Sequence, residues 1–258
     1  MTITINGVHY FHSHITKYSV SGELSHILKI KLTLSARMDM TLNLEQILRT
    51  VELLLHNQSP AHDFQHILRV YRNAEMISKK EEGADLDIIL AAALLHDLVV
   101  YPKGSRKTKH SADESADIAR KILSEYKYYS AEKIEKVVYA IRTHSYSKKL
   151  IPSTLEGKIL QDADRLDAIG AIGIARTFSV GGSENRSLYN PKDPFCESDR
   201  ELDDTRWTLD HIKKKLLILK NSMHTKTAKE IAKQRTDFIE SFLNQLRKEI
   251  LQRESGQQ

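Results

Sequence analysis

Cysteine, proline and long apolar runs are all scarce in this sequence of 258 residues. Its single cysteine, Cys196, cannot form an internal disulfide, so packing must stabilise the fold and a reducing, cytoplasmic location is expected. No stretch reaches the roughly 18 consecutive apolar residues that a membrane-spanning helix needs. His9, His12, His14 and Lys17 interrupt the apolar run that a signal peptide would show. The sequence therefore predicts neither export nor membrane insertion.

A strong excess of one charge is also lacking. The 39 basic and 34 acidic side chains leave a formal net charge of only +5. This charge suits a small anionic substrate but gives no strong signal for nucleic-acid binding. With 40% hydrophobic residues, the chain can bury the core of one large domain. Nothing in the sequence fixes the oligomeric state.

Apolar residues recur at helical spacing from about residue 42 onward, and period-two alternation is rare there. The helical pattern includes Ile47, Val51, Leu54 and Leu55, then Phe64, Ile67, Leu68 and Tyr71. Ser111 with Glu114, and Thr227 with Glu230, have the spacing of capping boxes, which predicts helices that begin at Ser111 and Thr227. The sequence therefore predicts an all-α fold, a helical bundle.

The pattern divides the chain into three segments. Residues 1–37 alternate apolar and polar residues in a strand-like way, notably over 28–34, so we expect an N-terminal extension that is either disordered or a short hairpin. Residues 38–250 form the predicted helical domain, and 251–258 a polar C-terminal tail. Within the domain, residues 181–205 are polar and aperiodic, which predicts a long loop that either covers a site or is a mobile surface loop.

A helix over residues 88–95 is apolar on every side and ends at His96 and Asp97. Such a helix belongs in the centre of the bundle. An ionised carboxylate at its end is costly unless it is paired or binds a metal. For an isolated pair of this kind, a buried hydrogen bond between the histidine and the aspartate would be the favoured explanation.

Two other segments supply further ligand-type residues. His66 lies one helical turn from His62 and Asp63. A second segment, just before a run of small and apolar residues, contains Asp162, Asp164 and Asp167. Histidines and aspartates from different helices can build a metal site in a bundle, and the sequence has no glycine-rich phosphate loop or nucleophile-elbow motif. Metal chemistry is the best-supported interpretation.

The order of these residues resembles the HD superfamily of metal-dependent phosphohydrolases. The resemblance lies in His66 within His-Ile-Leu-Arg-Val, in His96-Asp97 after an apolar helix, and in Asp164 within Asp-Ala-Asp-Arg-Leu. Flanks similar to a prokaryotic-type HD hydrolase subgroup include Ala-Ile-Arg-Thr-His-Ser, which ends after His144. The similarity covers about residues 40–250.

The resemblance implies an HD-type helical hydrolase domain in which His66, His96, Asp97 and Asp164 bind a divalent cation. Such a domain would cleave a phosphate ester or nucleotide with a metal-activated water. Imidazole and carboxylate ligands suit manganese, iron, cobalt, nickel, zinc or magnesium. The expected partner is therefore a small phosphorylated substrate, with nucleotides included.

Other residues are candidates for supporting roles. His110 and His144 are candidates for holding a second metal, and His144 alternatively contacts substrate or lies near a helix end. The predicted catalytic residues are Asp97, His144 and Lys103. The predicted substrate-binding residues are Lys103, Arg69, Arg165 and His62. The basic loop around Lys103 is equally compatible with a solvated surface, and either arginine with a structural ion pair.

Two other functions compete with a phosphohydrolase as explanations of these residues. The spacing of His62 and His66 matches that of a zinc-protease helix, but Asp63 stands where a glutamate acts as base there. A non-catalytic metal- or nucleotide-binding regulatory module is the stronger alternative. Such a module would be distinguished from an enzyme by a filled metal coordination shell with no open position for water.

Overall fold

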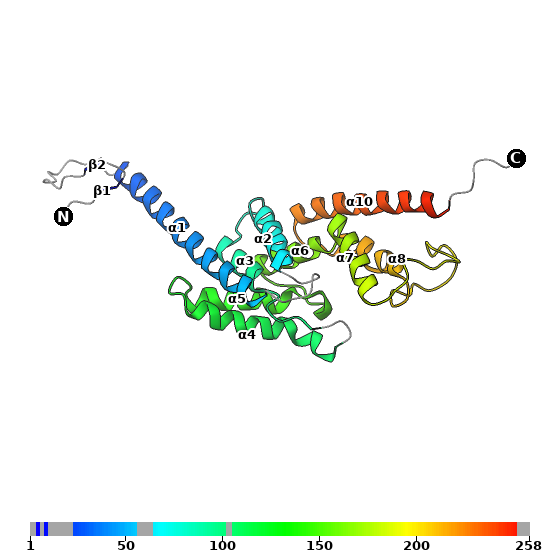
Figure 1. Cartoon of the computed structure of the whole chain (residues 1–258). Coiled ribbons are helices and arrows are strands. Elements are labelled where there is room, and N and C mark those ends of the chain that lie inside the picture. Colours follow the sequence, from blue (N-terminus) through cyan, green and yellow to red (C-terminus); the bar gives the residue numbers. More distant parts are fainter. Residues whose placement is uncertain (1–3, 6–7, 10–22, 56–63, 102–104, 252–258) are drawn as a thin grey trace. The chain divides into compact units, whose positions relative to one another are not determined.

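The structure is a computed structural model that describes the backbone of residues 4–5, 8–9, 23–55, 64–101 and 105–251, with side chains from residue 38 onward. The chain divides into two compact units, Met1–Thr41 and Leu42–Gln258. The helical elements carry most of the described chain, which confirms the predicted all-α fold (Figure 1). No helix in the described ranges is long and apolar enough to cross a bilayer.

The first unit contains a short antiparallel pair of strands, β1 (Thr4–Ile5) and β2 (Val8–His9). The helix α1 (Glu23–Leu54) begins in this unit and extends into the second. The strand-like pattern over residues 28–34 was therefore misleading, because this segment is helical. Residues four apart lie on the same face of a helix, and a run with apolar residues at every second position contains such pairs. A short run of this kind therefore fits a helix as well as a strand.

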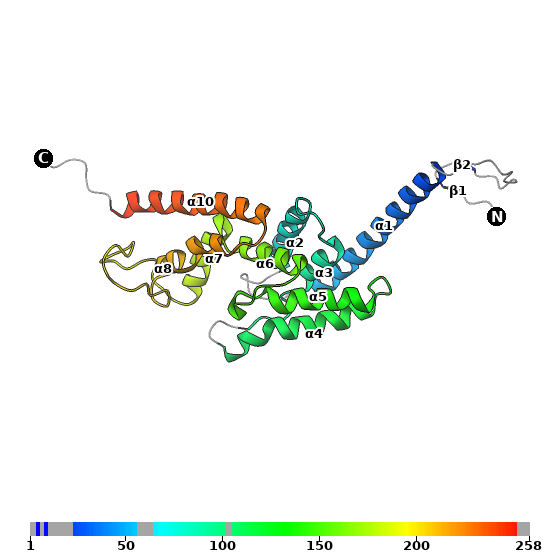
Figure 2. The ribbon, with the colours of Figure 1, turned by 180° about the vertical axis from the view of Figure 1, so that it is seen from behind.

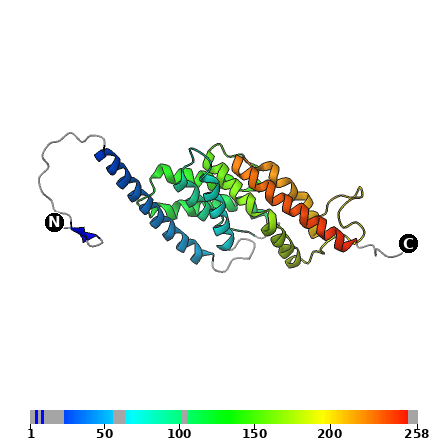
Figure 3. The same ribbon diagram turned by 90° about the horizontal axis from the view of Figure 1, so that it is seen from above.

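The second unit is a bundle of helices whose bounds are α2 (Phe64–Ser78), α3 (Leu86–Leu95), α4 (Ser111–Ser124), α5 (Ala131–His144), α6 (Leu155–Asp167), α7 (Gly170–Ser183), α8 (Thr208–His211), α9 (Leu217–Leu219) and α10 (Lys226–Ile250). Short turns separate some of them: η1 (Arg106–His110), η2 (Tyr146–Lys148), the π-helical η3 (Ile212–Leu216) and η4 (Lys220–Ser222). Helix α3 packs against α2, α4, α5 and α6 (Figure 2). Helix α10 packs against α6 and α7 (Figure 3).

The burial of α3 explains its central place. Every residue from Ile88 to Leu95 is buried, as its apolar sequence predicts. The helix starts at Asp85, whose carboxylate accepts hydrogen bonds from the amides of Asp87 and Ile88. This cap satisfies backbone donors that would otherwise lack partners, so the start of the helix is fixed.

The two expected capping boxes are not formed. Helix α4 continues directly from η1, and the hydroxyl of Ser111 donates to the carbonyl of Thr108 instead of accepting from its own helix. Helix α10 is capped two residues before Thr227, by Thr225, whose side chain accepts from the Ala228 amide. The helices lie where expected, but a neighbouring residue caps α10 and no side chain caps α4.

The long polar segment over residues 184–207 is attached to the bundle. The guanidinium of Arg200 donates to both carboxylate oxygens of Asp210, over 2.6 and 2.9 Å. Phe195 is buried under Arg247, which also forms an ion pair of 2.7 Å with Glu197 on the loop. This anchoring gives the segment a defined path against α8 and α10.

Candidate metal centre

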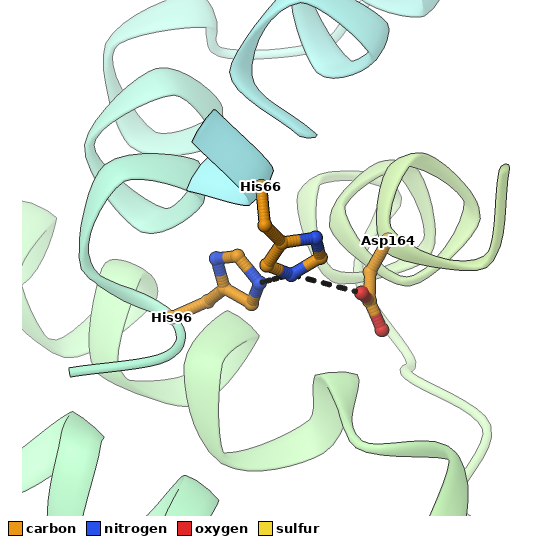
Figure 4. A group of neighbouring side chains, drawn as sticks. All are labelled: His66, His96 and Asp164. Carbon is orange, nitrogen blue, oxygen red and sulfur yellow. Dashed lines mark hydrogen bonds and ion pairs between the residues drawn. The ribbon is translucent and has the colours of Figure 1, made fainter. Parts of the chain in front are cut away.

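Histidines and aspartates from α2, α5 and α6, and from the two residues that follow α3, converge inside the second unit. His66, in the first turn of α2, is fully buried. Its Nε2 lies 3.3 Å from Nε2 of His96 and 3.6 Å from carboxylate oxygens of both Asp97 and Asp164. Figure 4 shows His66, His96 and Asp164 pointing toward one another from separate elements. His144, the last residue of α5, places Nε2 3.5 Å from the second oxygen of Asp97.

Backbone carbonyls determine which nitrogen of two histidines carries the proton. Nδ1 of His96 lies 2.9 Å from the carbonyl oxygen of Ala93, and Nδ1 of His144 lies 2.6 Å from that of Ile141. A carbonyl oxygen only accepts hydrogen bonds, so each Nδ1 is the donor. In the neutral imidazoles, Nε2 therefore presents a lone pair to the centre.

Asp167 sets the same orientation in His66. Its Oδ2 lies 2.8 Å from His66 Nδ1, so the carboxylate accepts a hydrogen bond from Nδ1–H. Asp167 is itself held by Arg69, which donates to both of its oxygens over 2.6 and 3.1 Å, and by Arg176 at 3.4 Å. A carboxylate behind a ligating imidazole is the usual way to fix a metal-binding histidine.

The Nε2 atoms of His66 and His96 thus face each other at 3.3 Å. Two lone pairs repel at this distance unless a proton or a metal ion lies between them. Two overlapping groups can hold an ion with ligand atoms within 4.8 Å of one another: His66, His96 and Asp164, and His96, Asp97 and His144. The donor set fits a divalent transition metal, because imidazole nitrogens and carboxylate oxygens are its ordinary ligands.

Electrostatics also favour a cation here. Burial alone would lower the pKa of His66, but the hydrogen bond with Asp167 and the charges of Asp97 and Asp164 raise it to about 9. Burial lowers the pKa of His96 to about 4, so this ring is neutral at pH 7. Three carboxylates therefore surround histidines that can carry at most part of the compensating charge.

A cavity of about 250 Å³ opens beside these residues. Of the residues at the centre, Asp97, His144 and Asp164 line this cavity. The side chains of Asp97 and Asp164 are 16% and 25% exposed, whereas those of His66 and His96 are fully buried. The opening lies on the carboxylate side, so a substrate can reach the centre there. No residue of the 184–207 segment lines this cavity, so the idea that this loop covers the site finds no support in the described structure.

The cavity also contains cations and an aromatic ring. Arg165, predicted to bind substrate, lines it and places its guanidinium 5.6 Å from the ring centre of Tyr146. Lys215 lies over the same ring, with Nζ 5.4 Å from its centre, and Arg176 also lines the cavity. Sequence reasoning missed Arg176, Lys215 and Tyr146. Only the run of three lysines ending at Lys215 gave a signal, and it does not tell which lysine points inward.

The remaining candidates divide clearly. Arg69 pairs with Asp167 and does not line this cavity, so its position matches the structural ion pair that was the alternative to substrate binding. His110 is exposed at the start of α4 and belongs to neither ligand group among the described residues. His62, Asp63 and Lys103 lie outside the described residues. Their proposed roles stay predictions.

Asp162, although beside Asp164 in the sequence, has a structural role. Its carboxylate accepts hydrogen bonds from the amides of His224 and Thr225 and from the Thr225 hydroxyl, each over 2.8 Å. These bonds connect α6 to the start of α10. Asp162 therefore holds the bundle together while Asp164, half a turn further along α6, faces the centre.

Sequence and structure comparisons place this geometry among known proteins. The model of the HD domain family matches residues 63–169, which include all four predicted ligands. "Uncharacterized protein YpgQ" of Bacillus subtilis is 37% identical over 212 residues, which cover 80% of this chain and 93% of that protein.

Solved structures agree with this relationship. The crystal structure of Bacillus subtilis YpgQ in complex with ADP is 34% identical and covers 83% of this chain and 97% of its own, with a TM-score of 0.63. A protein of Bacillus thuringiensis described as an HD-superfamily hydrolase is 33% identical and covers 81% of this chain and 97% of its own, with a TM-score of 0.64.

Proposed function

The chain belongs to the HD domain family, whose structural relatives include HD-superfamily hydrolases, and from this membership we propose that it is a metal-dependent phosphohydrolase. Its substrate is a small phosphorylated molecule, with nucleotides the favoured class. The four metal-binding residues are His66, His96, Asp97 and Asp164, and His144 is available on the Asp97 side.

One observation carries the proposal. Three imidazoles, His66, His96 and His144, use Nδ1 to bind their supporting groups and turn Nε2 toward two aspartates, and the aspartates border an open cavity. A divalent cation bound there would supply a water of lowered pKa and would neutralise charge on a phosphoryl oxygen. A closed coordination shell, as expected of a non-catalytic module, would leave no such access.

The cavity wall supplies the groups that a phosphate needs. Arg165, Arg176 and Lys215 place three cations around the opening, and arginine in particular matches phosphate oxygens with paired donors. The face of Tyr146 offers a surface for an aromatic or sugar ring. That a YpgQ structure was solved with ADP supports a nucleotide as the bound molecule.

The test begins with metal analysis of protein purified without added metal. A phosphatase screen over nucleotides and small phosphoesters then follows, with each candidate metal restored in turn. We expect phosphate or pyrophosphate release with at least one metal, and a loss of about a hundredfold or more in Asp97→Asn. Asp117→Asn is the matched control, since Asp117 pairs with Arg120 and Arg142 on the surface. Metal-loaded protein without turnover on any phosphoester would identify a non-catalytic module instead.

A further inference from the structure

A second cavity, of about 430 Å³, lies between α2, the start of α7 and α10. Asp167 lines this cavity but not the metal-centre cavity, and the two cavities share no lining residue. The walls that matter here are formed by Arg69, Arg72, Asn73, Gly170, Arg235 and Phe238. Nothing in the proposed hydrolytic reaction uses this space.

The charges on this wall do not balance. Three arginines, Arg69, Arg72 and Arg235, line the cavity with a single carboxylate, that of Asp167. That carboxylate already accepts from His66, Arg69 and Arg176. Among the described residues that line the cavity, basic side chains therefore outnumber acidic ones by three to one.

Arg235 shows this most clearly. Its two hydrogen bonds go to neutral oxygens, the carbonyl of Leu166 and the side-chain amide oxygen of Asn73 at 3.0 Å. Burial lowers the pKa of Arg235, which reflects the cost of removing its charge from water. The charge of a partly buried guanidinium favours an anionic partner, and neutral acceptors do not compensate that charge.

The start of α7 adds amide donors to the same wall. Gly170 and Ala171 line the cavity, and no side chain caps this helix. Gly170 has φ of +75°, and a Cβ there would lie 3.1 Å from Cβ of Arg235, so only glycine lets the arginine side chain lie along the helix start. The free amides and the helix dipole favour an anion beside the arginines.

We propose that this cavity is a second binding site, separate from the metal centre, for the phosphate group of a small molecule. The arginines provide the charge and the paired donors that phosphate oxygens accept. Phe238, 52% exposed at the rim, offers an apolar surface to the remainder of the molecule. The inference concerns binding, so it does not depend on the proposed hydrolase activity.

Equilibrium dialysis of the full chain with radiolabelled inorganic phosphate tests the site. Asp97→Asn serves as the background, because it disables the metal centre and the phosphate binding that depends on it. Arg72→Ala removes one exposed arginine of the cavity. Lys79→Ala is the control, since it removes an exposed cation just after the end of α2 and outside the cavity, where Lys79 pairs with Glu75. Circular dichroism checks that each variant is folded.

We expect the Asp97→Asn protein to retain one saturable phosphate site. Adding Arg72→Ala should weaken it about tenfold or more, whereas Lys79→Ala should leave it within about twofold. Loss of all saturable phosphate binding in Asp97→Asn, or equal effects of Arg72→Ala and Lys79→Ala on that binding, would overturn the proposal. If Asp97→Asn fails to fold, crystals of the unaltered chain soaked in tungstate replace it. Density against Arg72 and Arg235 supports the site, and density only at the metal centre contradicts it.

Discussion

Among single residues, Asp167 connects the metal centre to the rest of the bundle. Its carboxylate accepts hydrogen bonds from Nδ1–H of His66 and from the guanidinium groups of Arg69 and Arg176. Burial alone would raise the pKa of Asp167, but the hydrogen bonds from His66 and Arg69 lower it well below its usual value. The side chain therefore stays ionised and keeps the His66 ring in one orientation.

Replacing this carboxylate by an amide gives a residue-scale prediction. Asp167→Asn should weaken metal binding by about ten- to a hundredfold, because the His66 ring loses its charged partner while all ligands remain. Metal affinity is measured by competition with a chelating dye. Asp113→Asn is the matched control, since it removes a surface carboxylate that pairs with Lys148. A metal affinity for Asp167→Asn within about twofold of that of the original chain would refute this role.

At this scale the sequence identified residues that the structure brings together more readily than it identified the groups that support them. His66, His96, Asp97 and Asp164 could be found because each stands at the end or start of an apolar helical stretch. The partners of the imidazoles could not be found in that way. Backbone carbonyls such as that of Ala93 have no sequence signature, and the pairing of Arg69 with Asp167 joins residues 98 positions apart.

At the scale of helices, the start of α10 depends on Thr225 and Asp162 together. Thr225 accepts from the Ala228 amide and donates its hydroxyl to Asp162 on α6. One side chain thus caps one helix and attaches it to another. Thr227, which the capping-box spacing singled out, lies inside the helix with its amide bound to Glu81.

The two threonines allow a direct comparison. Thr225→Ala should lower the free energy of unfolding by about 1–2 kcal/mol, because it removes a cap and leaves a buried carboxylate with one donor fewer. Thr227→Ala should lower the free energy of unfolding by less, since no hydrogen bond from its hydroxyl supports the helix start. Urea denaturation of both variants measures the difference. Equal losses, or a larger loss for Thr227→Ala, would mean that the cap does not stabilise α10.

Helix positions were predicted well because apolar periodicity extends over many residues, whereas caps depend on single hydrogen bonds. The spacing of Ser111 with Glu114 was as good as that of any capping box. The preceding turn η1 nevertheless gave the Ser111 hydroxyl another partner, the Thr108 carbonyl. The path of residues 184–207 could not be predicted either, because ion pairs such as Arg200 with Asp210 leave no periodic pattern in the sequence.

For the whole molecule, the described core and the metal centre both belong to the unit that begins at Leu42. Deleting residues 1–37 should therefore leave a folded, metal-binding and active protein, with the buried residues Leu44, Ile47 and Val51 retained on α1. Thermal melts, metal content and turnover of the truncated and full chains provide the comparison. A truncated protein that binds metal but no longer turns over substrate would show that the removed segment serves the active site.

The overall architecture followed from the sequence because one apolar helix, α3, had to lie inside a bundle of amphipathic neighbours. The sequence did not predict which residues line the metal-centre cavity. Arg176 and Lys215 come from α7 and from the π-helical turn η3, where an added residue per turn changes which side chains point inward. Periodicity analysis assumes a regular helix, so it cannot predict the direction of Lys215.

The most direct test of the metal centre is an anomalous-difference map from crystals of the full chain loaded with manganese. The predicted result is a strong peak bonded to Nε2 of His66 and His96 and to carboxylate oxygens of Asp97 and Asp164. A second peak beside His144 would identify a two-metal centre. Ordered protein crystals that show no peak at this cluster, or a peak only elsewhere, would contradict the assignment.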